Sequence, residues 1–271
     1  MNAHIMTANT SPEAAPAPPV PALRVEDLSM WFGEGPTLNR VLEGLSLDVA
    51  PGEFISIVGP SGVGKTTLLR CFSGLIAPSA GSVYVGADPV RQPHPAVGVI
   101  FQDYSRSLLP WMNTVDNVAF PLEGRFDKKE RRRRAEEALA SVGLEGQGHK
   151  YPWEMSGGMQ QRVAIARGLA YEAKILLMDE PFASVDAQTR FNLEDLVADL
   201  RRSLGLTVIL VTHDIDEALY LSDRVVVLAG RPATVVEVLD TDFGDHRDQA
   251  ATKADPRFGE ARTNILGLLG H

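Results

Sequence analysis

The sequence predicts an α/β fold with a mainly parallel core sheet, an antiparallel β subdomain and an inserted helical subdomain. Residues 23–28 and 41–49 alternate apolar and polar side chains, which is typical of half-exposed antiparallel strands. From Thr114 to about 173, β-branched runs stop and helical periodicity replaces them. Three short runs are almost continuously apolar, as parallel strands covered on both faces are: 54–58, 174–178 and 207–211.

The chain divides into three predicted parts. Residues 1–22 are rich in proline and alanine and poor in large apolar side chains, so we expect a disordered leader. Residues 23–240 are predicted to form the folded domain, with the helical subdomain inserted at about 104–173. Residues 241–271 are predicted to form a short C-terminal tail with a helical end.

The order of the other elements supports this arrangement. Neighbouring parallel strands need a crossover connection, usually a helix, and the segment between the second and third apolar runs supplies one. The remaining predicted elements are strands at 83–85 and 97–101, helices beginning near Asp127 and Gly158, the crossover helix at 187–204, and a closing hairpin at 225–228 and 234–238.

Composition limits the classes of function. The chain has 271 residues, of which 44% are hydrophobic and 23% charged, so it is long enough for one large core. Cys71 is the single cysteine and no secretory signal is evident, which favours a reducing, cytoplasmic compartment. No apolar stretch approaches the ~20 residues of a membrane span, so any membrane association is expected to go through a partner. A net charge of −9 disfavours a general nucleic-acid binder.

Residues 59–66 match the phosphate-binding loop GxxxxGK[ST] of P-loop NTPases. Its glycines permit a tight turn that directs backbone N–H groups, and the start of the following helix, toward an anion. Lys65 is expected to reach the β- and γ-phosphates, and the Thr66 hydroxyl to bind Mg²⁺. A plain surface turn is the alternative, which the strand–loop–helix context disfavours. The predicted nucleotide contacts are Gly59, Pro60, Ser61, Gly62, Val63, Gly64, Lys65, Thr66 and Thr67.

Polar side chains follow the other buried strands, and ligands of open parallel sheets bind beyond the carboxyl ends of the strands. Asp179 is a predicted Mg²⁺ ligand, and Glu180 is predicted to orient or deprotonate an attacking water. His213 is predicted to contact the γ-phosphate and help arrange that water, although a lone histidine is more often structural. Gln102 is expected to contact Mg²⁺ or the water and, at the junction with the insert, to sense the γ-phosphate.

A second predicted phosphate cradle precedes the helix near Gly158. Ser156, Gly157 and Gly158 would present free N–H groups at a helix start, by the same physics as the first loop. A bare linker is the alternative reading of these small residues. The distinctive feature is the whole string from Ser156 to Arg167.

With these motifs in this order, the chain resembles the nucleotide-binding subunit of an ABC transporter from about Leu23 to Asp240. The resemblance implies an ABC-type cassette in which the loops above serve one ATPase cycle. Two positions depart from the family pattern. The usual signature LSGGQ reads Met155-Ser156-Gly157-Gly158-Met159, and Val185 replaces the usual leucine before Asp186.

The resemblance also implies how the second cradle is used. Two subunits are expected to pair head to tail as a homodimer, with each ATP between Lys65 of one subunit and Ser156 and Gly157 of the other. Asp186 is implied as a further residue at the nucleotide. Phe32 matches the aromatic position that stacks on adenine, and Trp31 is the alternative.

Within the family, the chain resembles the ATP-binding subunits of bacterial importers of the nitrate, sulfonate and taurine group. Residues 108–118 and 231–233 carry this resemblance. It implies ATP and Mg²⁺ as cofactors, integral membrane permease subunits as partners, an indirect link to a solute-binding protein, and a peripheral location at the cytoplasmic face of the inner membrane. The alternatives are a soluble ABC ATPase doing mechanical work on nucleic acid or ribosomes, and a small-molecule P-loop kinase. No nucleic-acid partner is expected.

Overall fold

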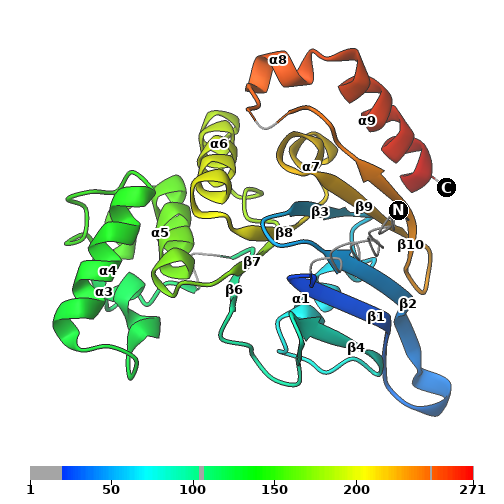
Figure 1. Cartoon of the computed structure of the whole chain (residues 1–271), viewed down its shortest axis with the longest axis horizontal. Coiled ribbons are helices and arrows are strands. Elements are labelled where there is room, and N and C mark those ends of the chain that lie inside the picture. The colour runs from blue at the N-terminus through cyan, green and yellow to red at the C-terminus, as the bar shows by residue number, and fades with distance from the viewer. Residues whose placement is uncertain (1–19, 104–106, 245, 271) are drawn as a thin grey trace, which may run out of the picture.

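The computed structural model describes residues 20–103, 107–244 and 246–270, and it has two sheets flanked by helices (Figure 1). The larger sheet has the strand order β10-β9-β3-β8-β7-β6. Its four strands from β9 to β7 and the edge strand β6 run parallel, and β10 pairs antiparallel with β9, which confirms the predicted parallel core and closing hairpin. Its strands are β3 (Phe54–Val58), β6 (Val97–Ile100), β7 (Ile175–Asp179), β8 (Thr207–Thr212), β9 (Arg224–Ala229) and β10 (Thr234–Asp240).

The smaller sheet is antiparallel, as the alternating pattern predicts. Its strand order is β2-β1-β4-β5, and its strands are β1 (Leu23–Phe32), β2 (Asn39–Val49), β4 (Ala80–Val85) and β5 (Asp88–Pro89). Backbone hydrogen bonds around one residue join the two sheets. Ala233 N donates to Val41 O at 2.9 Å, and Glu43 N donates to Ala233 O at 3.0 Å.

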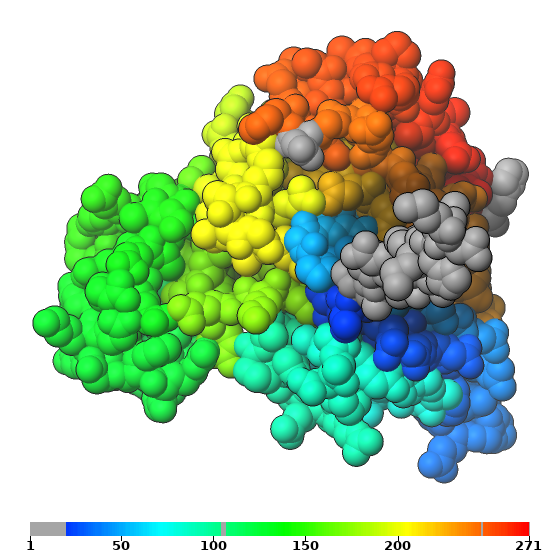
Figure 2. All heavy atoms as spheres, viewed as in Figure 1, coloured from blue at the N-terminus to red at the C-terminus, as the bar shows by residue number. Residues whose placement is uncertain are grey.

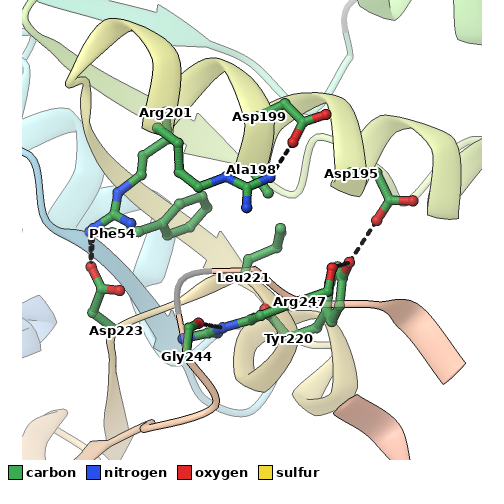
Figure 3. A pocket seen from close by; sticks show the side chains of 11 residues that line it. Phe54, Asp195, Ala198, Asp199, Arg201, Tyr220, Leu221, Asp223, Gly244 and Arg247 are labelled. Atoms are coloured by element: carbon green, nitrogen blue, oxygen red, sulfur yellow. Dashed lines mark hydrogen bonds and ion pairs between the residues drawn. The ribbon is translucent and has the colours of Figure 1, made fainter. Parts of the chain in front are cut away.

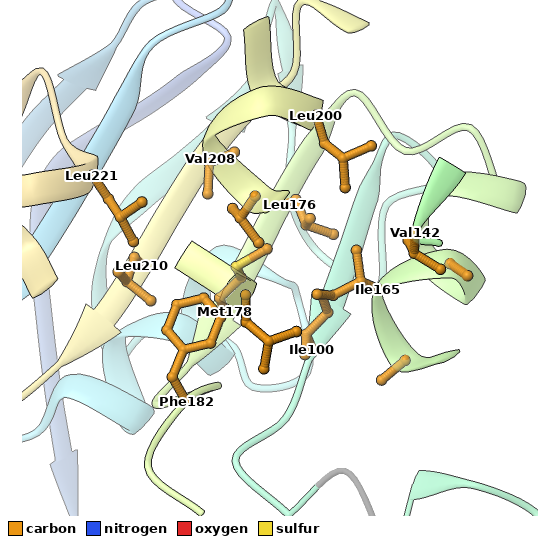
Figure 4. Close-up of a cluster of buried hydrophobic side chains, with 14 of the residues drawn as sticks. Ile100, Val142, Ile165, Leu176, Met178, Phe182, Leu200, Val208, Leu210 and Leu221 are labelled. Carbon is orange, nitrogen blue, oxygen red and sulfur yellow. The ribbon is translucent and has the colours of Figure 1, made fainter. Parts of the chain in front are cut away.

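Every residue of β3, β7 and β8 is buried, because helices or the second sheet cover both faces of these central strands. The side chains alternate between two apolar clusters. One lies toward α6 and the insert and includes Met178 and Leu210, which Figure 4 shows packed beside Phe182. The other lies toward the antiparallel sheet and includes Ile57 and Val211. The three strands therefore hold the loops that follow them rigidly at one edge.

Most helices of the described part begin at residues whose side chains accept backbone N–H groups; α1, which follows Gly64, is an exception. Asp127, Ser156, Asp186 and Asp214 each cap a helix in this way, which satisfies donors that lack a partner in the first turn. The helices are α1 (Lys65–Phe72), α3 (Thr114–Ala119), α4 (Lys128–Ser141), α5 (Gly157–Ala170), α6 (Ala187–Leu204), α7 (Ile215–Leu221), α8 (Gln249–Lys253) and α9 (Pro256–Leu269).

The helical insert forms a lobe at one side of the molecule (green in Figure 2). Helices α3, α4 and α5 pack on one another, and α5 also contacts β6 and α6. The insert therefore meets the parallel sheet through α5. The exact limits of the subdomain at about 104–173 stay a prediction, and residues 104–106 lie outside the described part.

The C-terminal segment packs across α7 and β9. Helix α9 contributes Phe258 and Ile265 to the core. Arg247 donates to the carbonyl oxygens of Leu219 and Tyr220. The Tyr220 hydroxyl donates to Asp195 at 2.7 Å (Figure 3). This segment thus covers a polar pocket of about 230 Å³ between α6, α7 and the chain end. The predicted leader, residues 1–22, falls mostly on residues 1–19, which lie outside the described part.

We expect Leu210→Ala to lower the free energy of unfolding by about 2–5 kcal/mol. Leu210 is fully buried on β8, so truncation leaves a cavity under Phe182 and the adjoining strands. Urea unfolding followed by circular dichroism measures the effect. Leu204→Ala, at the exposed end of α6, is the matched control, and we expect it to stay within about 0.5 kcal/mol. Equal losses in the two variants would contradict the assigned core.

Candidate active site

The loop between β3 and α1 needs its glycines for two different reasons. A Cβ on Gly59 would lie 2.7 Å from Leu228 O, so the loop approaches β9 too closely for any side chain. Gly64 has φ 118°, which side-chain-bearing residues rarely adopt, and a Cβ there would also meet Val41 and Leu42 at 2.8 Å. Sequence and packing therefore fix a tight loop that leads directly into the first turn of α1.

Lys65 lies inside this loop and is almost fully buried. Its ammonium group donates to the carbonyl oxygens of Gly59 at 2.8 Å and Pro60 at 3.1 Å. Burial lowers the pKa of Lys65, and the nearby carboxylates of Glu180 and Asp179 oppose that shift. The cation is thus held at the centre of the loop and close to the acidic end of β7. Of the other predicted contacts, Val63 is buried, Pro60, Ser61, Gly62 and Thr66 are exposed, and Thr67 is half-buried.

Thr66 and Asp179 are brought together although they are far apart in sequence. The Thr66 hydroxyl donates to Asp179 Oδ1 at 3.2 Å, and Asp179 is buried at the end of β7. Burial raises the pKa of Asp179, while the bond from Thr66 lowers it. One hydroxyl and one carboxylate oxygen at an otherwise open edge suit Mg²⁺, which keeps several waters and takes few protein ligands. In the described ranges, no cluster of three or more His, Cys, Asp or Glu side chains forms a metal site made of protein alone.

Glu180 lies at the meeting point of the other predicted catalytic residues. Its Oε2 accepts a hydrogen bond from Gln102 Nε2 at 3.1 Å and lies 3.2 Å from His213 Nδ1. Its backbone has φ 43°, an uncommon conformation for a residue with a side chain, and its N–H donates to Val211 O at 2.8 Å. The two adjacent carboxylates have different partners: Asp179 accepts from Thr66, and Glu180 lies against Gln102 and His213. The structure therefore gathers Gln102, Glu180 and His213, as predicted.

The second predicted cradle lies at the start of α5. Ser156 Oγ accepts the N–H of Met159 at 3.3 Å, and Gly157 is the first helical residue. Gly158 has a packing role that the sequence did not reveal, since a Cβ there would meet Thr189 Cγ2 of α6 at 2.5 Å. This cradle is on the insert side of the molecule, apart from α1 in Figure 1. The two predicted phosphate cradles of one chain are thus on separate elements.

Asp186 and Phe32 are predicted to lie at the nucleotide, and for both residues this stays a prediction. Asp186 caps α6, accepting from Thr189 N at 3.0 Å and from its hydroxyl at 2.6 Å, and these bonds lower the pKa of Asp186. Phe32 and Trp31 both stay substantially exposed at the end of β1. Adenine stacking on Phe32, with Trp31 as the alternative, stays a prediction.

Two arginines near the site were missed in the sequence. Arg190 Nη1 pairs with Asp214 Oδ2 at 3.1 Å, next to His213. Arg167 of α5 donates to Ser107 O at 2.7 Å and to Ser107 Oγ at 2.8 Å, beyond the Gln102 loop. Each pair joins different elements, so no local motif signals it.

Comparison with known proteins identifies the family. Residues 42–183 match the family described as ABC transporter. A protein of Methanocaldococcus jannaschii described as an uncharacterized ABC transporter ATP-binding protein is 44% identical over 248 residues, covering 91% of each chain. The chain belongs to the ABC transporter family. As a member of it, the chain is an ATP-binding ATPase.

Other relatives are ATP-binding proteins of importers. The nitrate import ATP-binding protein NrtD of Synechococcus elongatus is 42% identical, covering 84% of each chain. The taurine import ATP-binding protein TauB of Chromobacterium violaceum is 45% identical, covering 83% of this chain and 87% of that protein. These values confirm the resemblance to the nitrate and taurine group.

Solved structures of ABC cassettes share the fold. The ADP- and phosphate-bound dimer of the cassette MJ0796 matches with a TM-score of 0.70 and 30% identity, covering 82% of this chain and all of that one. The cbiO1 subunit of Clostridium perfringens matches with a TM-score of 0.75 and 28% identity, covering 90% of this chain and 98% of that one. The predicted ABC-type cassette is therefore confirmed. None of the helices in the described part is long and apolar enough to span a bilayer.

Proposed function

We propose that this ABC subunit hydrolyses ATP to power a membrane importer of a small solute, by ATP-driven closure of a dimer. The observation that carries the proposal is the convergence at one sheet edge: Lys65 and Thr66 follow β3, Asp179 ends β7 with Glu180 directly after it, and His213 follows β8. Phosphate, metal and water ligands are thereby presented together, which is the arrangement that phosphoryl transfer to water needs.

Each residue of the site is assigned a role in ATP hydrolysis. Lys65 and the loop N–H groups bind the β- and γ-phosphates, and Glu180 accepts a proton from the attacking water. His213 contacts the γ-phosphate and, 3.2 Å from Glu180, keeps that carboxylate in position. Thr66, Asp179 and Gln102 would hold Mg²⁺, which neutralises charge on the phosphates when it is bound. Gln102 Nε2 donates to Glu180 Oε2, which places its amide where it would also contact the metal or the water.

We propose a homodimer in which the ATP held by one subunit is completed by Ser156, Gly157, Gly158 and Asp186 of the other. Two observations support it. The cradle at α5 is apart from the phosphate loop of its own chain, and the related cassette MJ0796 is a dimer with ADP and phosphate. A two-fold axis brings each signature to the other subunit's loop and closes the assembly.

The transported solute is proposed from the relatives alone. Import proteins for nitrate and taurine are 42–45% identical to this chain, so an anion such as nitrate, a sulfonate or taurine is the proposed cargo. The subunit would lie at the cytoplasmic face of the inner membrane, bound to permease subunits that receive cargo from a solute-binding protein.

Exposed aromatic side chains on the insert support a docking surface for the permease. Trp111 is 70% and Trp153 66% exposed, and Trp153 stacks on Tyr151 with ring centroids 4.7 Å apart. Thr114 binds Lys150 O through its N–H at 2.7 Å and its hydroxyl at 2.8 Å, which holds the two aromatic segments side by side. Large exposed aromatic rings favour a protein partner over solvent.

Affinity purification of the tagged subunit from membranes tests the proposal. We expect a multi-span permease and a solute-binding protein to be recovered, and the double variant Trp111→Ala/Trp153→Ala to reduce permease recovery by about tenfold while basal ATPase stays intact. Leu38→Ala, another exposed apolar residue on the opposite subdomain, is the control. Recovery with ribosomes or DNA would overturn the transport function in favour of the soluble alternative.

A further inference from the structure

Packing restrains the imidazole of His213 only weakly. Its side chain is 57% exposed, and its Nδ1 lies 3.2 Å from Glu180 Oε2. The position of the ring relative to Glu180 therefore depends on the backbone turn from Thr212 to Asp214 that carries it. Any contact that fixes this turn also fixes the distance between the imidazole and the carboxylate.

Asp214, directly after His213, contacts two helices with its two carboxylate oxygens. Oδ1 accepts two N–H groups of the first turn of α7, at 3.0 and 3.2 Å, and so caps that helix. Oδ2 accepts from Nη1 of Arg190, on α6, at 3.1 Å. The backbone N–H of Asp214 donates to Thr212 Oγ1 at 3.0 Å. The residue beside His213 is thus held by α7 on one side and by α6 on the other.

Arg190 reaches Asp214 from the first turn of α6. Its N–H donates to the carbonyl oxygen of Asp186 at 2.9 Å, and Asp186 is the residue that caps this helix. The Arg190 side chain is 31% exposed, yet its Nε is buried and has no hydrogen-bond partner within the part of the chain that the structure describes. Buried donors without a partner are uncommon, so a purely stabilising role accounts poorly for the position of this guanidinium.

We propose that Arg190 is a positioning residue for His213: its ion pair with Asp214 connects the turn that carries the imidazole to the first turn of α6. This inference rests on the proposed role of His213 in ATP hydrolysis. The guanidinium acts on Asp214 and not on the γ-phosphate or the attacking water. Its contribution is to restrict the turn, so that His213 Nδ1 stays within reach of the Glu180 carboxylate.

Steady-state ATPase of the purified full chain tests the inference. We expect Arg190→Met, which keeps a long side chain and loses the charge, to lower kcat by about tenfold with KM for ATP within about twofold, because the nucleotide contacts stay intact. Arg190→Lys should recover about half or more of the wild-type kcat, since the ion pair uses a single N–H group of the guanidinium. Partly exposed ion pairs contribute little to folding, so the urea midpoints of both variants should equal that of the wild type.

Asp214→Asn separates the ion pair from the helix cap. Asparagine caps helices about as well as aspartate does, so its side-chain oxygen can still accept the two N–H groups of α7. The charge that faces Arg190 is lost. We therefore expect Asp214→Asn to lower kcat as much as Arg190→Met does. The double variant should be no worse than either single variant, since both substitutions remove the same contact.

Arg262→Met is the matched control for Arg190→Met. Arg262 of α9 pairs with Asp216 at 3.1 Å, so it also joins the first turn of α7 to another helix, at the distance found for Arg190 and Asp214. Its partner is not adjacent to His213. We therefore expect Arg262→Met to keep the wild-type kcat.

NMR of the chain with isotope-labelled histidine adds a readout that a merely structural role would not move. The signal of the His213 ring is assigned by its loss in His213→Ala. It should shift in Arg190→Met and in Asp214→Asn, and it should stay unchanged in Arg262→Met. An unchanged signal in Arg190→Met, wild-type kcat in that variant, or a loss of kcat shared by Arg262→Met would overturn the inference. So would a loss that Asp214→Asn does not share or that Arg190→Lys does not recover.

His213→Ala separates this inference from the proposed function. If that variant keeps full ATPase, the assigned role of His213 is wrong and the positioning role falls with it. If His213→Ala is inactive and Arg190→Met behaves as Arg262→Met does, only the positioning role is wrong.

Discussion

Glu180→Gln is expected to retain ATP binding while lowering turnover by about 10²–10⁴-fold. The amide is nearly isosteric with the carboxylate and its oxygen can still accept the hydrogen bond from Gln102. It cannot take a proton from the attacking water, so bound ATP persists and keeps the two subunits together. Phosphate release measures turnover, and size-exclusion chromatography with ATP measures the trapped dimer.

Glu172→Gln is the matched control for this change. Glu172 also has a positive φ, of 60°, and pairs with Arg134 on the surface, far from the sheet edge where Glu180 lies. We expect normal ATPase and no ATP-dependent dimer stabilisation beyond the wild type. If Glu180→Gln hydrolyses ATP at a near-normal rate, Glu180 is not the catalytic base. If it is inactive but stays monomeric with ATP, the shared-nucleotide dimer is the part that fails.

Lys65→Ala is expected to weaken ATP binding by about 10–100-fold, the value of losing charge-assisted hydrogen bonds to phosphate. The ammonium group is already buried in the loop on the carbonyls of Gly59 and Pro60, so little reorganisation is needed to meet a phosphate. Isothermal titration calorimetry or fluorescent-nucleotide displacement measures the dissociation constant.

Lys174→Ala is the control for Lys65→Ala because it removes an exposed lysine from the opposite end of β7. We expect its affinity for ATP to equal that of the wild type. Circular dichroism checks that Lys65→Ala folds, since the substitution leaves two loop carbonyls without their donor. A folded Lys65→Ala variant with unchanged affinity would exclude the predicted phosphate contact.

Most strands and helices could be predicted from the sequence, because the apolar pattern of each segment matches its burial in the fold. The short, almost continuously apolar runs around Ile57, Leu177 and Ile209 have the length and composition of buried strands, and the crossover helix predicted at 187–204 matches α6 at both ends. The site residues that directly follow strand ends could also be predicted from the sequence. Asp179, Glu180 and His213 converge because the topology places the carboxyl ends of parallel strands at one edge.

The features that sequence did not reveal are pairings across elements. Nothing local to Arg190 indicates Asp214 as its partner. The glycine at 158 was predicted as a phosphate contact, yet its position against Thr189 gives it a packing role as well. Such packing roles depend on contacts between segments that are far apart in the sequence, and the spacing of residues within a motif does not reveal these contacts.

The contact between Gly158 and Thr189 has a mechanical consequence. Asp186 accepts two hydrogen bonds from Thr189, and the Thr189 side chain fills the space beside Gly158. The start of α5 and the start of α6 are therefore in direct contact. Ser156 and Asp186 would therefore approach the nucleotide of a neighbouring subunit as one rigid unit. Its arrival or departure at a bound nucleotide would be one concerted event, in which neither residue engages before the other.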